Sequence, residues 1–156
     1  AAQHDRFFMK RAIAYPTCEE EIRILERYTS GARPMETVRP ICSAQDIVDM
    51  QQLVAQVYSS REVRSYISLI AQASRKHSAL QLGVSTRGAI FLLKAAQARA
   101  LLSGRDYVTP EDVQYMAAPV LAHRLILSPE ARMRTMTAER VLSQVIGSVQ
   151  VPVRTA

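Results

Sequence analysis

Six serine or threonine residues stand at positions typical of helix N-caps, and each precedes a segment with helical spacing of apolar residues. The clearest signal is Thr109-Pro110-Glu111-Asp112, which joins an N-cap residue, a proline in the first helical position and two acids. Thr17-x-x-Glu20 has the spacing of a capping box. The chain is therefore expected to be a succession of helices with N-caps at Thr17, Ser43, Ser59, Ser85, Thr109 and Thr137.

Few residues interrupt these helices, since the 156 residues include only five glycines and seven prolines. The helix expected after Ser43 carries a stripe of apolar residues that we expect to be buried: Ile47, Met50, Leu53, Val54 and Val57. Lys76–Leu82 is expected to be a polar link, and Leu125–Leu127 a short apolar segment. The sequence predicts an all-α fold, an orthogonal helical bundle over residues 17–150 followed by a tail at 151–156.

The N-terminal stretch has a different pattern. Arg6–Tyr15 alternates in the manner of a β-strand with apolar residues on both faces, and Pro16 ends it. No second strand of comparable strength follows, and a strand without partners is not stable alone. Residues 1–16 are therefore expected to be a remnant of a sheet, in a chain that is a piece of a longer protein.

Several classes of protein are not expected from the composition. No apolar run is long enough to span a membrane, and the first residues lack the apolar core of a signal peptide. Cys18 and Cys42 are expected to be reduced thiols in a cytoplasmic protein. The three histidines lie far from both cysteines in the sequence, so no metal site is expected.

The chain is basic, with a formal net charge of +6, but its Lys and Arg residues are spread and form no run. Nucleic-acid binding is not expected from such a distribution, although a helical nucleic-acid-binding module or a protein-adaptor module stays an alternative. The segment Gly83–Gly88 has the glycine spacing of a phosphate loop, yet Ala89 and Ile90 replace its Lys and Ser/Thr. The sequence offers no catalytic set of its own.

Two arginines are candidate functional residues. If Ser85 is an N-cap, Arg87 lies in the first turn of the helix, where a cation opposes the helix dipole by about 0.3–1 kcal/mol. Free backbone N–H groups beside a guanidinium would suit a phosphate group. Arg6 lies at the edge of the expected strand, where it could face a neighbouring subunit. For both residues the alternative is an ordinary solvated arginine.

Taken in order, these segments resemble the MoxR family of AAA+ ATPases, specifically its C-terminal lid domain. Ala2–Phe7 is similar to the family's AQLDRF, with His4 where Leu is usual. Tyr15–Glu21 resembles its YPxxEEE segment, and Gly83–Gly88 its GxSxR segment. The run Ala95–Glu130 resembles the most characteristic stretch of the lid.

The resemblance implies roles for these residues. Arg87, with Ser85, would bind the nucleotide phosphate as the second sensor, and Arg6 would be an arginine finger acting on the ATP of a neighbouring subunit. The expected strand would be the last strand of the α/β ATPase core. The whole protein would use ATP and Mg²⁺, form a homo-oligomeric ring, and remodel or mature a client protein that the sequence does not identify. This chain lacks Walker A and Walker B, so by itself it is expected neither to hydrolyse ATP nor to bind it tightly.

Overall fold

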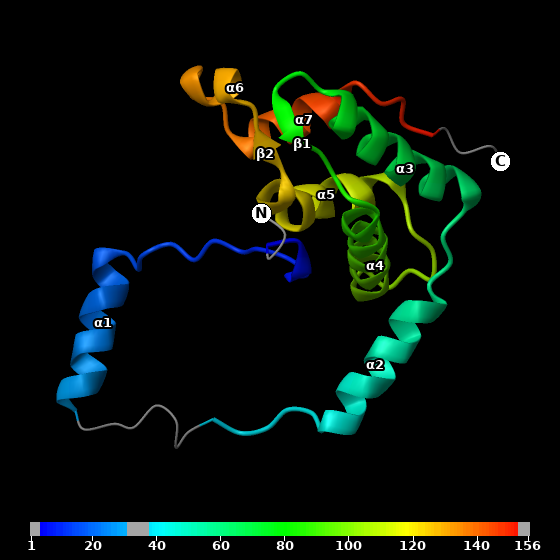
Figure 1. Ribbon diagram of the computed structural model, residues 1–156. Coiled ribbons are helices and arrows are strands. Elements are labelled where there is room, and N and C mark those ends of the chain that lie inside the picture. The colour runs from blue at the N-terminus through cyan, green and yellow to red at the C-terminus, as the bar shows by residue number, and fades with distance from the viewer. Residues whose placement is uncertain (1–3, 31–37, 153–156) are drawn as a thin grey trace. The chain divides into compact units, whose positions relative to one another are not determined.

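The computed structural model describes residues 4–30 and 38–152, and helices dominate it (Figure 1). The expected all-α fold is confirmed, and the described strands form one two-stranded sheet. In chain order the elements are η1 (His4–Arg6), α1 (Cys18–Thr29), α2 (Ala44–Gln56), α3 (Arg61–Lys76), β1 (Leu80–Leu82), α4 (Thr86–Leu102), α5 (Pro110–Leu121), η3 (Ala122–Arg124), β2 (Ile126–Leu127), α6 (Pro129–Met133) and α7 (Ala138–Gly147).

The chain divides into two compact units, one made of Ala1–Lys10 with Met50–Ala156 and the other of Arg11–Asp49. We call the first the packed unit and the second the N-terminal helical unit. Helix α2 crosses the boundary between them. The domain limits expected at residues 16 and 150 stay a prediction.

One hydrophobic core holds the packed unit together. It lies among α3, α4, α5 and α7, and α4 makes its most extensive contact with α5. Apolar side chains spaced at three and four residues along each helix supply the core, as the sequence predicts. The largest fully buried apolar side chains are Tyr66, Ile70, Leu92, Leu121 and Leu142.

The two short strands pair in antiparallel fashion, with Leu80 opposite Leu127 and Leu82 opposite Ile126. The polar link expected at Lys76–Leu82 is wrong for its last three residues, because Leu80–Leu82 form the strand β1. Two other local expectations also change. The N-cap of α3 is Ser60 rather than Ser59, and Ser128 caps α6, a short helix that was not expected.

The N-terminal segment does not form the expected strand over Arg6–Tyr15. His4–Arg6 is a 3-10 helix, and residues 7–17 have no regular secondary structure. No described segment pairs with them as a strand, and a lone strand has no ladder of hydrogen bonds to stabilise it. Instead, the backbone N–H of Lys10 donates to the carbonyl of Pro119 in α5 at 2.8 Å.

The N-terminal helical unit has well-formed helix starts but few buried side chains. Thr17 and Glu20 form the predicted capping box, in which Thr17 N donates to Glu20 Oε2 at 2.7 Å. Neither α1 nor α2 has a buried residue. The stripe expected to be buried in α2 is therefore mostly exposed, with Leu53 at 50%, while Val57, just beyond the helix, is buried.

Candidate functional site

The candidate site lies at the N-terminus of α4. Ser85 is the N-cap, as predicted, with extended backbone (φ −73°, ψ 164°) and a hydroxyl that accepts from Gly88 N at 3.0 Å. Thr86 and Arg87 follow as the first two helical residues, and their backbone N–H groups meet no acceptor among the described residues. Such free N–H groups at a helix start carry partial positive charge and suit an anion.

Helix α3 fixes the position of this N-cap. The buried hydroxyl of Ser74 donates to Ala71 O at 2.7 Å and accepts from Val84 N at 2.9 Å. Arg75 Nε donates to Val84 O at 2.7 Å. Both backbone groups of the residue before Ser85 are thus tied to the end of α3, which sets where α4 begins.

Gly83 allows this close approach. A Cβ atom on Gly83 would lie 2.6 Å from the backbone nitrogen of Arg75, closer than real Cβ contacts occur. Only glycine therefore lets the chain pass α3 at this point without a shift of the backbone.

Arg87 occupies the exposed side of this helix start. Its side chain is exposed and makes no hydrogen bond or ion pair with any residue that the structure describes. The first turn of α4 contains no acid, unlike those of α1 and α5. A cation is therefore held at the positive end of a helix without a described partner, which leaves its guanidinium available to an incoming anion.

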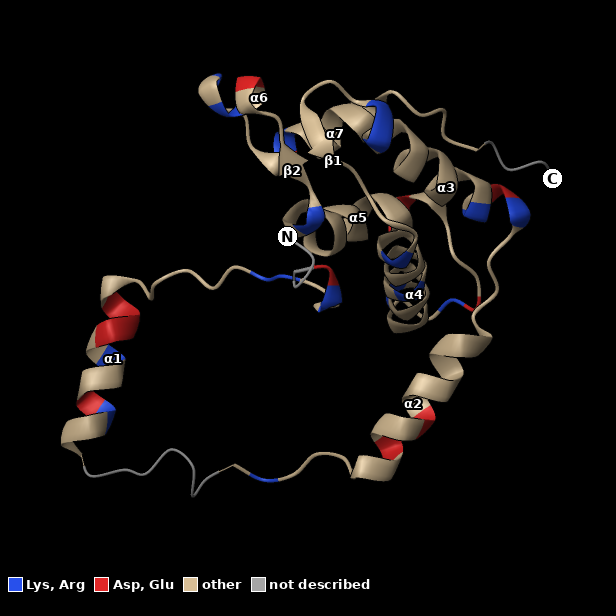
Figure 2. Ribbon diagram, viewed as in Figure 1, with Lys and Arg blue, Asp and Glu red and all other residues tan. Residues whose placement is uncertain are grey.

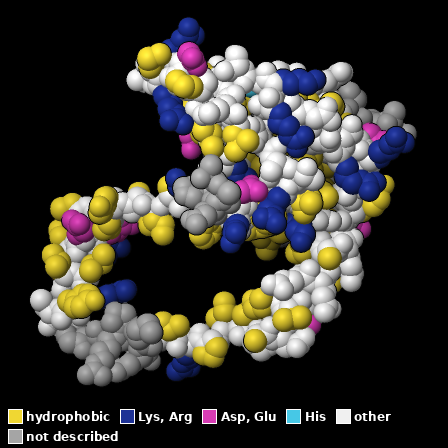
Figure 3. Space-filling model, viewed as in Figure 1, with side chains coloured by type: hydrophobic (Ala, Val, Ile, Leu, Met, Phe, Trp, Pro, Cys, Tyr) yellow, Lys and Arg dark blue, Asp and Glu magenta, His cyan; other side chains and the backbone are white. Residues whose placement is uncertain are grey.

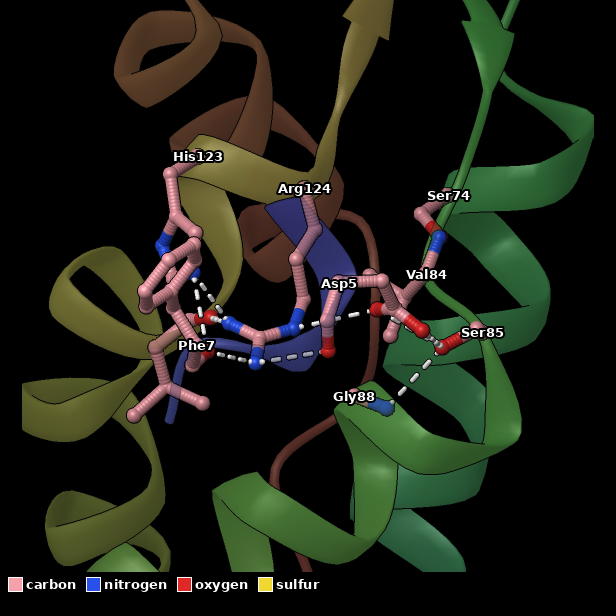
Figure 4. A network of polar contacts seen from close by, with 9 residues as sticks. Asp5, Phe7, Ser74, Val84, Ser85, Gly88, His123 and Arg124 are labelled. Carbon is pink, nitrogen blue, oxygen red and sulfur yellow. Dashed lines mark hydrogen bonds and ion pairs between the residues drawn. The ribbon is translucent and has the colours of Figure 1, made fainter. Parts of the chain in front are cut away.

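Behind the helix start lies a polar network centred on Arg124 and Asp5 (Figure 4). Arg124 Nε lies 3.2 Å from Asp5 Oδ1, and the arginine side chain is only 1% exposed. Ser85 Oγ donates to the Asp5 carboxylate, at 3.1 Å from Oδ1 and 3.2 Å from Oδ2. The N-cap hydroxyl of α4 thus contacts the N-terminal segment of the chain directly.

Arg124 also binds backbone carbonyls on both sides of this network. Its guanidinium donates to Val120 O at the end of α5 and to Phe7 O in the N-terminal segment. Burial lowers the pKa of Arg124, and the neighbouring Asp5 carboxylate acts in the opposite direction. The guanidinium also lies 5.1 Å above the Phe91 ring of α4. This one side chain therefore joins η3, α5, α4 and the residues around Asp5.

Arg6 directly follows Asp5 in the sequence. Its side chain is exposed and has no polar contact with a described residue. The hydrogen bond between Ser85 and Asp5 connects the two segments that carry Arg87 and Arg6, although 80 residues separate the bonded pair. The sequence points to each arginine separately and does not predict that their segments meet.

Two places in the packed unit, the pair His123 and Arg124 and the single residue Asp112, make more polar contacts than their sequence positions predict. His123 and Arg124 look in the sequence like residues that stabilise the end of α5, and the Arg124 bond to Val120 O fits that interpretation. Their contacts with Phe7 and Asp5 lie 116 or more residues away and have no local sequence signal.

Asp112 is the second case, and it lies outside the candidate site. Its carboxylate is fully buried and accepts two hydrogen bonds from Arg105, each at 2.7 Å, and another from Arg99. Desolvation raises the pKa of Asp112, but the bonds from Arg105, Thr109 N and Arg99 outweigh it and lower the pKa to about 2. This ion pair joins α4 to the start of α5 and has a structural role.

Within residues 4–30 and 38–152, no three His, Cys, Asp or Glu residues gather in a way that could hold a metal ion. No helix in the same ranges has the length and apolar character needed to cross a bilayer.

Comparison with known proteins gives matches along nearly the whole chain. Residues 72–145 match the AAA lid domain. The uncharacterized protein YeaC of Bacillus subtilis (strain 168) is 42% identical over 98% of this chain and 48% of its own length. Chaperone MoxR1 of Mycobacterium tuberculosis is 32% identical over 97% of this chain and 42% of its own. Protein MoxR of Paracoccus denitrificans is 31% identical over 83% and 43%.

A solved structure supports the same relationship. A crystal structure from Cytophaga hutchinsonii ATCC 33406, described as that of a "putative ATPase", superposes with a TM-score of 0.87 at 30% identity and covers 97% of this chain. The chain spans slightly under half the length of that structure and of the curated relatives described above.

Proposed function

We propose that this chain, which belongs to the MoxR family of AAA+ ATPases and contains the AAA lid domain, supplies Arg87 to bound ATP as a second-sensor residue. The observation that carries the proposal is the exposed guanidinium in the first turn of α4, which has no partner among the residues that the structure describes. Ser85 would contribute as the N-cap at which α4 begins, so that the free N–H groups of the first turn face the nucleotide phosphate.

The chemistry expected of Arg87 is electrostatic. During phosphoryl transfer, negative charge spreads over the phosphate oxygens, and a guanidinium held in place stabilises that charge. Mg²⁺, where bound with ATP, would neutralise further phosphate charge. Because Val84, the residue before Ser85, is bonded to α3 through both backbone groups, the first turn of α4 would offer Arg87 to the γ-phosphate from a defined position.

Arg6 is proposed as an arginine finger that acts on the ATP of a neighbouring subunit. Its exposure and its lack of a described partner suit a residue that reaches out of its own chain. In the whole protein, such contacts would occur in a homo-oligomeric ring. ATP hydrolysis would then drive chaperone-like remodelling or maturation of a client protein, a proposal to which the relative named Chaperone MoxR1 lends support.

The role of Arg87 is tested by Arg87→Ala in a protein that carries this lid together with an ATPase core. Turnover of ATP should fall by about tenfold or more, because a positioned charge is lost from the transition state. Lys94→Ala is the control, since Lys94 is an exposed cation on the same helix. Equal turnover in the two variants would count against the second-sensor role.

The role of Arg6 is tested by mixing subunits. Arg6→Ala subunits are combined with subunits that cannot bind ATP but keep Arg6. If Arg6 acts across the boundary, the mixture should recover activity that neither variant has alone. Arg11→Ala, which removes a nearby exposed cation, should hydrolyse ATP at the unaltered rate. Activity that depends only on the Arg6 of the ATP-binding subunit would rule out a finger acting in trans.

A further inference from the structure

The buried side chain of Arg124 connects the segments that carry the two candidate arginines. We propose that Arg124 is a positioning residue, which holds the Asp5 carboxylate on the N-cap of α4 so that Arg6 and Arg87 keep a fixed relation. The catalytic consequence of this link rests on the function proposed above, whereas the link itself can be tested on this chain alone.

The contacts of Arg124 exceed what a helix end requires. A cation that only stabilises the C-terminus of α5 needs the bond to Val120 O and can stay in solvent. Arg124 is instead 1% exposed and aims Nε at Asp5 and a terminal nitrogen at Phe7 O. A buried charge is costly unless it is paired, so Asp5 is the group that makes this burial tolerable.

The first turn of α4 packs directly on the arginine. A Cβ atom on Gly88 would lie 3.3 Å from Arg124 Cδ and 3.1 Å from Val84 Cγ1, so glycine gives the arginine stem its space. Gly88 follows Arg87 directly and donates its N–H to Ser85. A movement of this turn would therefore reach Arg124 by packing and Asp5 by the Ser85 hydroxyl.

Two further contacts keep the N-terminal segment beside α4 and α5 independently of Asp5. The Phe8 and Phe91 rings lie 5.2 Å apart between centroids, and Lys10 N donates to Pro119 O at 2.8 Å. Loss of the carboxylate should thus leave the segment attached but with Arg6 in a less defined position. Arg124 would thus align Arg6 and Arg87 without contacting the nucleotide itself.

The link is tested by hydrogen exchange on the 156-residue chain. Asp5→Ala should speed exchange at the Gly88 amide by about tenfold, the factor expected for the loss of a charge-assisted hydrogen bond at Ser85, while the Lys10 amide should keep its protection because its bond to Pro119 O does not involve Asp5. Asp106→Ala is the matched control, because Asp106 is an exposed acid in the same unit. Unchanged exchange at Gly88 would overturn the link.

A double-mutant cycle then isolates the part played by Arg124. In an Arg124→Lys background, which keeps the charge but not the planar fork, Asp5→Ala should add little to exchange at Gly88. Fully additive effects would show that the two residues act separately and would overturn the proposal. If the Arg124→Lys chain fails to fold, the Asp5→Ala comparison with Asp106→Ala still tests the link, because neither Asp5 nor Asp106 belongs to the buried core.

The catalytic consequence is tested in a protein with an ATPase core. Asp5→Asn should lower kcat several-fold with KM for ATP little changed, and it should have no added effect in an Arg6→Ala background. If Arg6→Ala and Arg87→Ala both reduce turnover while Asp5→Asn does not, the positioning role fails and the proposed function stands. If neither arginine matters, the proposed function fails, and the exchange cycle still decides whether the link exists.

Discussion

The packed unit and the N-terminal helical unit contain equally well-started helices but differ in what holds them in place. In the packed unit, α3, α4, α5 and α7 each bury several side chains in one core. Helix α1 has a capping box, three acids in its first turn and Arg27 in its last, yet it buries nothing. Local signals are thus sufficient to define where a helix begins, whereas burial decides what it packs against.

Because α1 and α2 bury no side chain, their apolar residues stay at the surface. Figure 3 shows hydrophobic side chains at the surface along α1 and α2. In α1, Leu25 is 65% and Tyr28 is 79% exposed. Figure 2 shows acidic residues on the same two helices. A helix of 12 residues is only marginally stable in water by itself, so α1 depends on its caps far more than the core helices do.

The largest difference between the two units should be in the unfolding free energy that each loses when one of its leucines is replaced by alanine. Leu92→Ala in α4 should cost about 2–5 kcal/mol of unfolding free energy, because Leu92 is 0% exposed. Leu25→Ala in α1 should cost less than about 0.5 kcal/mol. Urea unfolding monitored by circular dichroism measures both, and similar costs would mean that the α1 face is covered in solution.

An intermediate effect is expected from acid. The pKa of Asp112 in the folded chain is about 2, below its usual 3.8, so its ion pair stabilises the packed unit above pH 4. As the pH falls from about 4 to about 2, the carboxylate is protonated and about 2 kcal/mol of stability should be lost.

Stability curves measured at several pH values test this expectation. Asp112→Asn should remove that part of the pH dependence and lower stability at neutral pH. If the variant and the original chain lose stability in parallel on acidification, the dependence comes from other carboxyl groups.

A smaller effect should follow from altering the capping box of α1. Thr17→Ala removes the hydroxyl that accepts from Glu20 N, a change worth about 1 kcal/mol to the helix. Carbon chemical shifts of residues 18–22 should move toward coil values, while the Tm of the packed unit stays constant. Thr17→Ser keeps a hydroxyl and should keep the helix. A drop in Tm with Thr17→Ala would show that the two units stabilise each other.

Local patterns predicted much of the fold. The caps Thr17, Ser85 and Thr109 were read from the sequence because a cap needs only a side chain and a backbone three residues away. The same pattern predicted the N-cap of α3 at Ser59, one residue before the observed cap Ser60, because both serines offer the same hydroxyl. The α2 stripe shows the limit, because apolar spacing identifies a face and not what covers it.

The candidate site was predictable only in part. The exceptional cation at Arg87 stood out against the acids of the other helix starts, so its place in the first turn was found from sequence alone. The Asp5–Arg124 pair joins residues 119 apart in the chain, and no local pattern specifies such a pair. The strand β1 was missed for the same reason, since its partner β2 comes more than forty residues later.

Gly83 makes the candidate site sensitive to a residue that would touch no ligand. Any side chain there would collide with the backbone of α3 and push Val84 and Ser85 outward. Such a substitution would displace the guanidinium four positions downstream while leaving every charged group chemically intact. A screen for loss of function should therefore find position 83 among its hits, and inspection of the charged residues alone would overlook it.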